Sequence, residues 1–176
     1  HDMGKPVMKT TDENGRDHFK GHAIASEQIA KTVMKRLKFD NDTIRKVTKL
    51  VAYHDYRMEP TGANVRRAMH EIGVELFPYY LAVRLADTKA QSSYERRGKL
   101  ENIIQIRELY RNALRNKECV TLKDLAVTGT DLINLGIAPG KELGTLLNEL
   151  LDMVIEDPAW NQKGKLCDYV KERFGF

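Results

Sequence analysis

Cysteine is scarce in this sequence of 176 residues, because only Cys119 and Cys167 are present and they stand far apart. Two isolated thiols provide neither a disulfide framework nor the close spacing of a cysteine-based metal site. Long apolar runs are also missing, since no stretch approaches the ~20 residues that a helix needs to cross a bilayer. The first residues lack the apolar core of a signal peptide. We therefore expect a protein of a reducing compartment, cytoplasmic and without a membrane partner.

Strand-like alternation and internal repeats are absent as well. The 29 Lys and Arg residues are interleaved with 25 Asp and Glu residues, which leaves a formal charge of +4. This mild basicity permits a phosphate-rich partner but does not demand one. The first residue is not methionine, as expected either for a tag boundary or for a fragment of a longer polypeptide.

Apolar residues recur at helical spacing along most of the chain, which predicts an all-α fold. The pattern predicts helices over residues 22–37, 41–56, 65–73, 75–92, 96–117, 128–136, 140–157 and 165–174. Residues 7–21, rich in Thr, Asn and Gly, are predicted to form a loop. A boundary near residue 119 predicts two domains, 1–118 and 119–176.

The opening residues combine two metal-ligand types, a histidine nitrogen and a carboxylate oxygen, in His1 and Asp2. The glycine and proline that follow are expected to end a helix there and leave the pair facing an open cleft. Asp87 lies on an otherwise apolar helix, where an unpaired charge costs several kcal/mol. Its partner is either Arg84, three residues away, or a metal ion shared with His1 and Asp2. We favour the metal ion.

The four other histidines differ in how strongly the sequence favours them as metal ligands or phosphate-binding residues. His54 ends an apolar stripe, and taken alone such a residue is more often a hydrogen-bonded core histidine than a ligand. His22 lies where loop becomes helix, so it either satisfies that helix end or grips a phosphate beside the helix N-terminus. His18 lies four residues earlier, but Gly21 argues against a regular helical pair. His70 stands among charged residues and is expected to be solvated.

The order of these residues resembles the HD superfamily of metal-dependent phosphohydrolases. The resemblance is carried by His1-Asp2-Met3-Gly4-Lys5-Pro6, His18-Phe19-Lys20-Gly21-His22, Leu50-Val51 with His54, and Arg84-Leu85-Ala86-Asp87. More narrowly, the chain looks like the HD region of bacterial tRNA nucleotidyltransferases, the CCA-adding enzymes and their poly(A) polymerase relatives. The narrower resemblance is carried by Leu125-Ala126-Val127-Thr128-Gly129-Thr130-Asp131-Leu132, Pro139-Gly140 and the leucine-rich helix that follows, which look like that family's tRNA-contacting tail.

The resemblance implies an HD-type helical bundle followed by a small helical C-terminal domain. It implies a divalent metal ion (Ni, Co, Mn or Mg) held by His1, Asp2 and Asp87, and substrates that are 2′,3′-cyclic phosphates or phosphomonoesters. Asp2 and Lys5 would act in catalysis, with Lys5 neutralising developing charge. His22 and His54 are also assigned to catalysis, holding a second ion or the phosphate. A nucleotidyltransferase head and one more histidine ligand are expected upstream.

A basic stripe on the long helix suggests an RNA partner. Arg107, Arg111 and Arg115 recur every four residues, and they either follow an RNA backbone or pair with neighbouring glutamates on a solvated face. Lys123 and Lys141 flank a turn whose backbone amides suit phosphate contact. The implied RNA is tRNA.

Two functions remain open from the sequence. The chain is either a phosphohydrolase domain of a tRNA nucleotidyltransferase or a catalytically silent body and tail that bind tRNA. The tail argues against a third class, the regulatory nucleotide hydrolases of the wider HD group.

Overall fold

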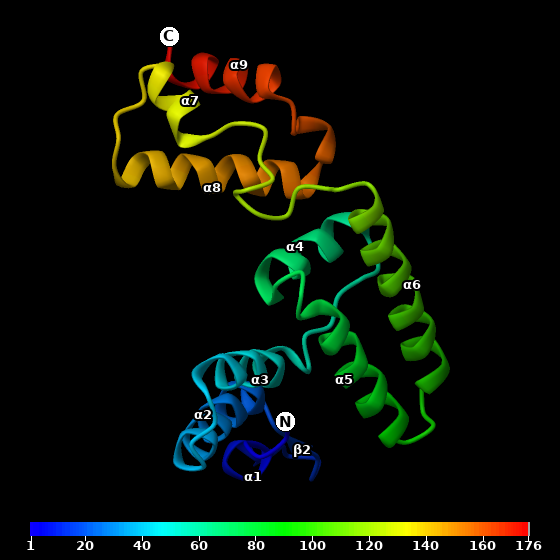
Figure 1. Ribbon diagram of the computed structural model, residues 1–176. Coiled ribbons are helices and arrows are strands. Elements are labelled where there is room, and N and C mark those ends of the chain that lie inside the picture. The colour runs from blue at the N-terminus through cyan, green and yellow to red at the C-terminus, as the bar shows by residue number, and fades with distance from the viewer. Residues whose placement is uncertain (176) are drawn as a thin grey trace. The chain divides into compact units, whose positions relative to one another are not determined.

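A computed structural model describes residues 1–175, and Phe176, the last residue of the predicted second domain, lies outside them. Most of the described residues are helical (Figure 1), which confirms the all-α fold class. The chain forms two compact units, of which the first contains residues 1–58 and 72–103. The second contains residues 59–71 and the chain from 104 onwards. The division after residue 118 stays a prediction about domains.

The first unit begins with short elements and continues with longer helices. Its elements are α1 (Lys5–Met8), β1 (Thr10–Thr11), β2 (Asp17–His18), α2 (His22–Arg36), α3 (Asn41–Tyr53), α5 (Phe77–Ala90) and the first part of α6 (Arg96–Arg115). The prediction of a loop over 7–21 is wrong in part, because β1 and β2 form an antiparallel hairpin. The expected break at Gly4 and Pro6 is also wrong. A helix begins there instead, with the proline in its first turn, where its missing N–H costs nothing.

Helices α2 and α3 pack against each other, joined by a short turn. The Asp40 side chain caps α3 by accepting a hydrogen bond from the Thr43 N–H over 2.9 Å. Ala30 of α2 and Ile44 and Val51 of α3 are buried in the core of the unit. On α3 the predicted helical spacing selects the buried face. On α2 the prediction of a packed face containing Ile24, Ile29, Val33 and Leu37 is wrong in part, because Ile24 and Leu37 are exposed and the buried residues are Ser26 and Ala30.

Helix α5 carries the largest buried side chains of the first unit, as its apolar sequence predicts. Phe77, Tyr80 and Leu81 are buried. The Tyr80 hydroxyl donates to the Tyr56 carbonyl oxygen over 2.7 Å, so the one polar atom of this ring is satisfied. This packing fixes α5 beside the segment that follows α3. It thereby also fixes the position of Asp87, which lies about one turn before the C-terminal end of α5.

The second unit gathers a separate core around a leucine-rich helix. Its elements are α4 (Gly62–Ile72, apart from the last residue), the rest of α6, α7 (Gly129–Asn134), α8 (Lys141–Glu156), the 3-10 turn η1 (Pro158–Trp160) and α9 (Lys163–Phe174). Leu150, Leu151 and Val154 of α8 pack with Leu166 and Val170 of α9. Among residues 1–175, no helix combines the length and the apolarity that crossing a bilayer requires.

A buried arginine ties α4 to the end of α8 within this unit. Arg66 donates to the carbonyl oxygens of Ile155 and Glu156 over 2.7 and 2.9 Å, and to Glu118 Oε2 over 2.9 Å. The last carbonyls of a helix have no partner inside the helix. The guanidinium therefore satisfies α8 at its C-terminal end while Glu118 balances its charge.

Candidate metal centre

The N-terminal residues are held against the start of α2 by a close contact at Gly4. Gly4 is buried, and its N–H donates to Ser26 Oγ over 2.8 Å. A Cβ atom at this position would lie 2.5 Å from the His22 carbonyl oxygen and 2.7 Å from the Ser26 nitrogen. Only glycine lets the two backbones approach so closely. The contact places His1 and Asp2 beside the first turn of α2.

His22 and His54 face each other through the same ring nitrogen. His22 opens α2 and its Nδ1 lies 2.9 Å from the Phe19 carbonyl oxygen, whereas His54 ends α3 and its Nδ1 lies 2.7 Å from the Val51 carbonyl oxygen. A carbonyl oxygen only accepts hydrogen bonds, so each Nδ1 carries the proton. In the neutral rings both Nε2 atoms then present lone pairs, and these atoms are 3.1 Å apart.

Asp2 Oδ1 completes a cluster of three acceptors. It lies 3.4 Å from the Nε2 atom of His22 and 3.4 Å from that of His54. It is buried and has no hydrogen-bond donor among the residues described. Three facing lone pairs are unfavourable unless a cation lies among them.

The spacing of these three atoms fits a metal ion. Two ligand atoms at ~2.1 Å from one ion are separated by about 3.0 Å in octahedral and about 3.4 Å in tetrahedral geometry. The measured separations, 3.1 and 3.4 Å, fall in this range. Histidines that bind a metal also commonly donate their other ring N–H to a carbonyl, as His22 and His54 do.

His1 lies between two carboxylates at the edge of this cluster. Its Nε2 is 3.5 Å from Asp2 Oδ2 and 3.7 Å from Asp87 Oδ1. One ligand atom from each of His1, Asp2 and His54 lies within 4.8 Å of the other two. Asp87 accepts a hydrogen bond from Gln91 over 2.7 Å and, in the described part of the chain, forms no ion pair with Arg84. The structure thus brings His1, Asp2 and Asp87 together.

Lys5 controls the charge of Asp2. Its ammonium group donates to Asp2 Oδ2 over 2.6 Å. Partial burial raises the pKa of Asp2, but the hydrogen bond and charge of Lys5, together with the charge of His54 and His22 when these rings are protonated, outweigh burial and lower the pKa below its ordinary value. Asp2 is therefore ionised at neutral pH, as a carboxylate ligand must be.

The predicted catalytic and metal-binding residues, apart from His1, line one cavity of about 360 Å³ in the first unit. They are Asp2, Lys5, His22, His54 and Asp87. His18 also borders it, although its Nε2 lies 2.9 Å from Asp12 Oδ2 on the exposed hairpin. Arg57 and Gln91 line the cavity too, and sequence reasoning missed them because neither belongs to a spaced motif. His70 lies in the second unit, where its Nδ1 is 2.8 Å from the Val120 carbonyl oxygen.

The residues predicted to bind RNA are exposed, but they differ in their partners. Arg111 pairs with Glu108 over 2.9 Å, and Arg115 bonds the Asn112 side chain. The remaining three, Arg107, Lys123 and Lys141, form no ion pair within residues 1–175. The predicted stripe is thus mixed, because Arg111 is paired with an acid whereas Arg107 forms no ion pair within residues 1–175.

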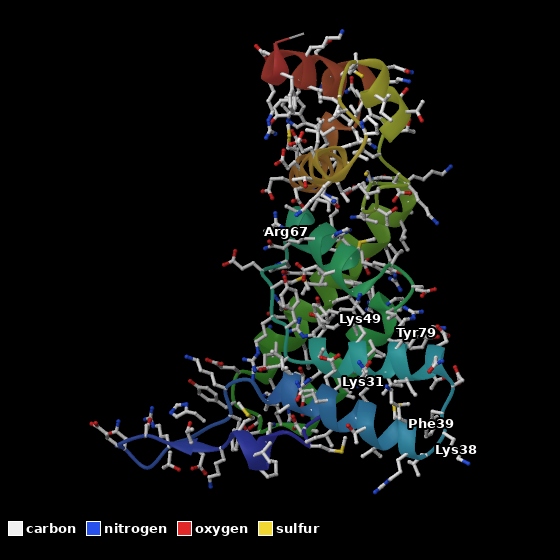
Figure 2. The ribbon with its side chains drawn as sticks, turned by 90° about the vertical axis from the view of Figure 1, so that its left-hand side faces the viewer. Lys31, Lys38, Phe39, Lys49, Arg67 and Tyr79 are labelled. Atoms are coloured by element: carbon white, nitrogen blue, oxygen red, sulfur yellow. The ribbon has the colours of Figure 1, made fainter. Side chains whose placement is uncertain are left out.

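A group of cations in the first unit was not singled out from the sequence. Lys31 of α2, Lys38 of the following turn and Lys49 of α3 form no ion pair within residues 1–175 and are labelled in Figure 2. Phe39 and Tyr79, labelled in the same view, are 49% and 63% exposed. The cations come from separate elements, so no periodic pattern joins them in the sequence.

Comparisons with known proteins identify relatives of most of the chain. A family model described as tRNA nucleotidyltransferase domain 2 matches residues 22–170, a range that includes His22, His54 and Asp87 but begins after Asp2. A CC-adding tRNA nucleotidyltransferase from Thermus thermophilus is 28% identical over 162 residues, which cover 89% of this chain and 34% of the relative. The chain thus spans about a third of that relative's length. No solved structure matches.

Proposed function

Because the chain belongs to the tRNA nucleotidyltransferase domain 2 family, we propose that it is the C-terminal portion of a tRNA nucleotidyltransferase, which adds or repairs the tRNA 3′ end. We further propose that the first unit is a phosphohydrolase that acts on 2′,3′-cyclic phosphates and phosphomonoesters with a divalent metal ion. Damaged tRNA 3′ ends present such groups. The nucleotide-adding chemistry is assigned to a head outside this chain.

The observation that carries the phosphohydrolase proposal is the buried Asp2 Oδ1 atom, which has no donor and faces two histidine lone pairs. A proton on one imidazole would satisfy two of the three acceptors, whereas a divalent ion would satisfy all three. Nickel, cobalt, manganese and magnesium are the candidates, and the two imidazole ligands favour the transition metals.

The residues of the chain divide into ligands and charge-balancing groups. Asp2, His22 and His54 would hold the ion, with His1 and Asp87 completing the shell on the open side. The ion would polarise a phosphoryl oxygen and activate water for attack. Lys5 would stabilise the negative charge that develops on the phosphate, since its ammonium group borders the same cavity.

A ligand substitution tests this proposal. Asp2→Asn keeps the size of the side chain but removes the anionic ligand. We expect it to lower hydrolysis of a 2′,3′-cyclic nucleotide by about a hundredfold or more, because a bound metal supplies several kcal/mol of transition-state stabilisation. The measurement is the rate with each of the four metals, alongside metal affinity from calorimetry. Asp152→Asn, on an exposed position of α8, is the matched control. Equal hydrolysis rates in wild type, Asp2→Asn and Asp152→Asn would refute the proposal.

A second candidate function is a silent tRNA-binding module. It is favoured by cations that form no ion pair in the described chain, among them Lys31, Lys38 and Lys49. Arg107, Lys123 and Lys141 extend this candidate to the second unit, while Arg111 and Arg115 would have to exchange their present partners for phosphate. Salt-dependent tRNA binding that is unchanged in Asp2→Asn, with no metal bound by the wild type, would select this function.

A further inference from the structure

A second cavity of the first unit, of about 480 Å³, lies beside the candidate metal centre. Its lining comes from the segment after α3, from α5 and from the start of α6: Arg57, Met58, Arg84, Glu95, Gly98, Lys99 and Asn102. The volume falls within the range of small-ligand sites in proteins, about 300–1,000 Å³. Three of the lining side chains are cations and one is an acid, so the cavity is suited to an anion.

Two of these cations have no carboxylate partner among residues 1–175. Arg84 donates only to the Tyr80 hydroxyl, over 3.2 Å, and Lys99 donates to Gln91 Oε1 over 3.0 Å. Both side chains are half-buried. A guanidinium group has five donors, so most of those on Arg84 remain available. Partly buried cations are normally balanced by an acid, and here the balancing charge is expected from a ligand.

The structural contacts of Arg84 use only part of its donor capacity. Its guanidinium lies over the Tyr80 ring, 5.8 Å from the centroid, and donates to the Tyr80 hydroxyl oxygen, while Tyr80 donates its own proton to the Tyr56 carbonyl. Next to Glu95, the Nε atom of Arg96 is buried and lacks an acceptor. The start of α6 thus adds another donor that the described residues leave unsatisfied.

The cationic cavity and the metal-centre cavity each share lining residues with a small third cavity of about 40 Å³. Arg84 and Lys99 of the cationic cavity line it, as do His54, Asp55 and Asp87 of the metal-centre cavity. Arg57 borders the cationic cavity, the small one and the metal-centre cavity. The shared lining places Arg84 and Lys99, which have no carboxylate partner in residues 1–175, next to the metal-centre cavity.

We propose that Arg84 and Lys99 bind a second phosphate of the substrate, one nucleotide away from the phosphate at the metal centre. The inference rests on the proposed phosphohydrolase function and narrows its substrate class. The substrate is the end of a polynucleotide strand, whose adjacent phosphates occupy the two cavities. A free mononucleotide fills only the metal centre and gains nothing from the cationic cavity.

The test compares two RNA probes that differ by one nucleotide. They are a mononucleotide 3′-phosphonate and a dinucleotide with the same 3′-phosphonate, which the proposed hydrolase cannot cleave, titrated calorimetrically into the metal-loaded protein at low salt. Lys99→Gln and Arg84→Gln should each weaken dinucleotide binding about tenfold, the loss expected for one charge-assisted hydrogen bond, and leave mononucleotide binding within about twofold. Lys99→Arg, which keeps the charge, should restore dinucleotide binding.

Two controls separate this proposal from its premise. Lys89→Gln makes the same charge change on an exposed position of α5 outside the cavity lining, and it should weaken neither probe. Asp2→Asn should weaken both probes if the metal centre binds phosphate. If Asp2→Asn bound both probes as wild type does while Lys99→Gln bound the dinucleotide more weakly, the proposed function would be overturned but the anion site would be supported. Equal binding of the dinucleotide by wild type, Lys99→Gln and Arg84→Gln would overturn the anion site, whatever Asp2→Asn shows.

Discussion

Gly4 is the residue on which the position of His1 and Asp2 depends. In Gly4→Ala the added methyl group would meet backbone atoms of α2 that cannot move independently. The N-terminal segment must shift away from α2, so we expect a loss of about 1–3 kcal/mol in the free energy of unfolding, the usual range for overpacking. The same shift separates Asp2 from His22 and should weaken metal binding. Urea unfolding and metal titration measure the two effects.

The contrasting residue is Gly144, within α8. Nothing lies within 4 Å of a Cβ atom built at this position. Gly144→Ala should therefore stabilise the chain by about 0.5–1 kcal/mol, because alanine loses less conformational entropy in a helix. If both alanine variants changed stability by the same amount, the close contact at Gly4 would be contradicted.

At the scale of single residues, the sequence allowed the candidate ligands to be found but not their hydrogen-bonded state. His1, Asp2 and Asp87 stood out as ligand types in unusual surroundings. The orientation of His22 and His54 depends on carbonyl oxygens three residues earlier in each case. Such contacts follow from how each helix begins or ends, and residue types alone do not specify that geometry.

Among the helices, α8 depends on an arginine from α4. In Arg66→Met the Ile155 and Glu156 carbonyls lose their donor, and Glu118 keeps a partly buried charge without its partner. Breaking a buried ion pair in this way costs about 3–5 kcal/mol. We expect a loss of that size in urea unfolding, and Arg66→Lys should recover little of it, because a lysine does not reproduce the planar fork of donors. Full recovery by lysine would show that charge alone matters.

Helix α7 is held at its start by a capping box whose acid is sensitive to pH. Lys163 donates to Asp131, and Thr128 adds backbone and hydroxyl hydrogen bonds, which together lower the pKa of Asp131 from 3.8 to about 2. Because the folded pKa lies below the unfolded one, this carboxylate stabilises the fold above pH 3.8, and the contribution disappears as the pH falls through about 2. Asp131→Asn should thus lower the urea midpoint at about pH 6, and the difference from wild type should shrink toward about pH 2.5.

A second aspartate provides the control for that experiment. Asp168 on α9 lies 3.6 Å from Lys171 and belongs to no capping box. Asp168→Asn should leave the urea midpoint nearly unchanged, since exposed ion pairs contribute about 0–1 kcal/mol. A difference for Asp131→Asn that stays constant with pH would contradict the role of its charge.

The length of an element decided whether the sequence predicted it. Helices α2 to α9 span two to six turns, and the apolar spacing identified every one of the longer members within a few residues of its ends. Helix α1 has four residues and each strand has two. No period can be recognised over so few residues, and their fold is set by contacts such as that between Gly4 and Ser26.

The grouping of helices in the whole chain lies beyond what sequence spacing predicts. The second unit takes residues 59–71 from the middle of the chain and joins them to the C-terminal helices. Contacts between distant positions make this grouping, among them Arg66 with Glu118 and His70 with Val120. A change of composition along the sequence marks where a segment differs from its neighbours. It does not show which distant segment completes its core.

For the chain as a whole, the proposed binding of tRNA should weaken steeply as the salt concentration rises. Each lysine that contacts a phosphate releases a counterion, so removing contacts makes the plot of log affinity against log salt concentration less steep. Replacing Lys31, Lys38 and Lys49 with glutamine should reduce the slope by about 2–3 if these unpaired cations contact RNA. The matched control removes the same charge from lysines that already pair with aspartates, namely Lys9, Lys46 and Lys171. Both triple variants have the same net charge. If the salt slope fell equally in both, overall charge and not this group of lysines would govern binding.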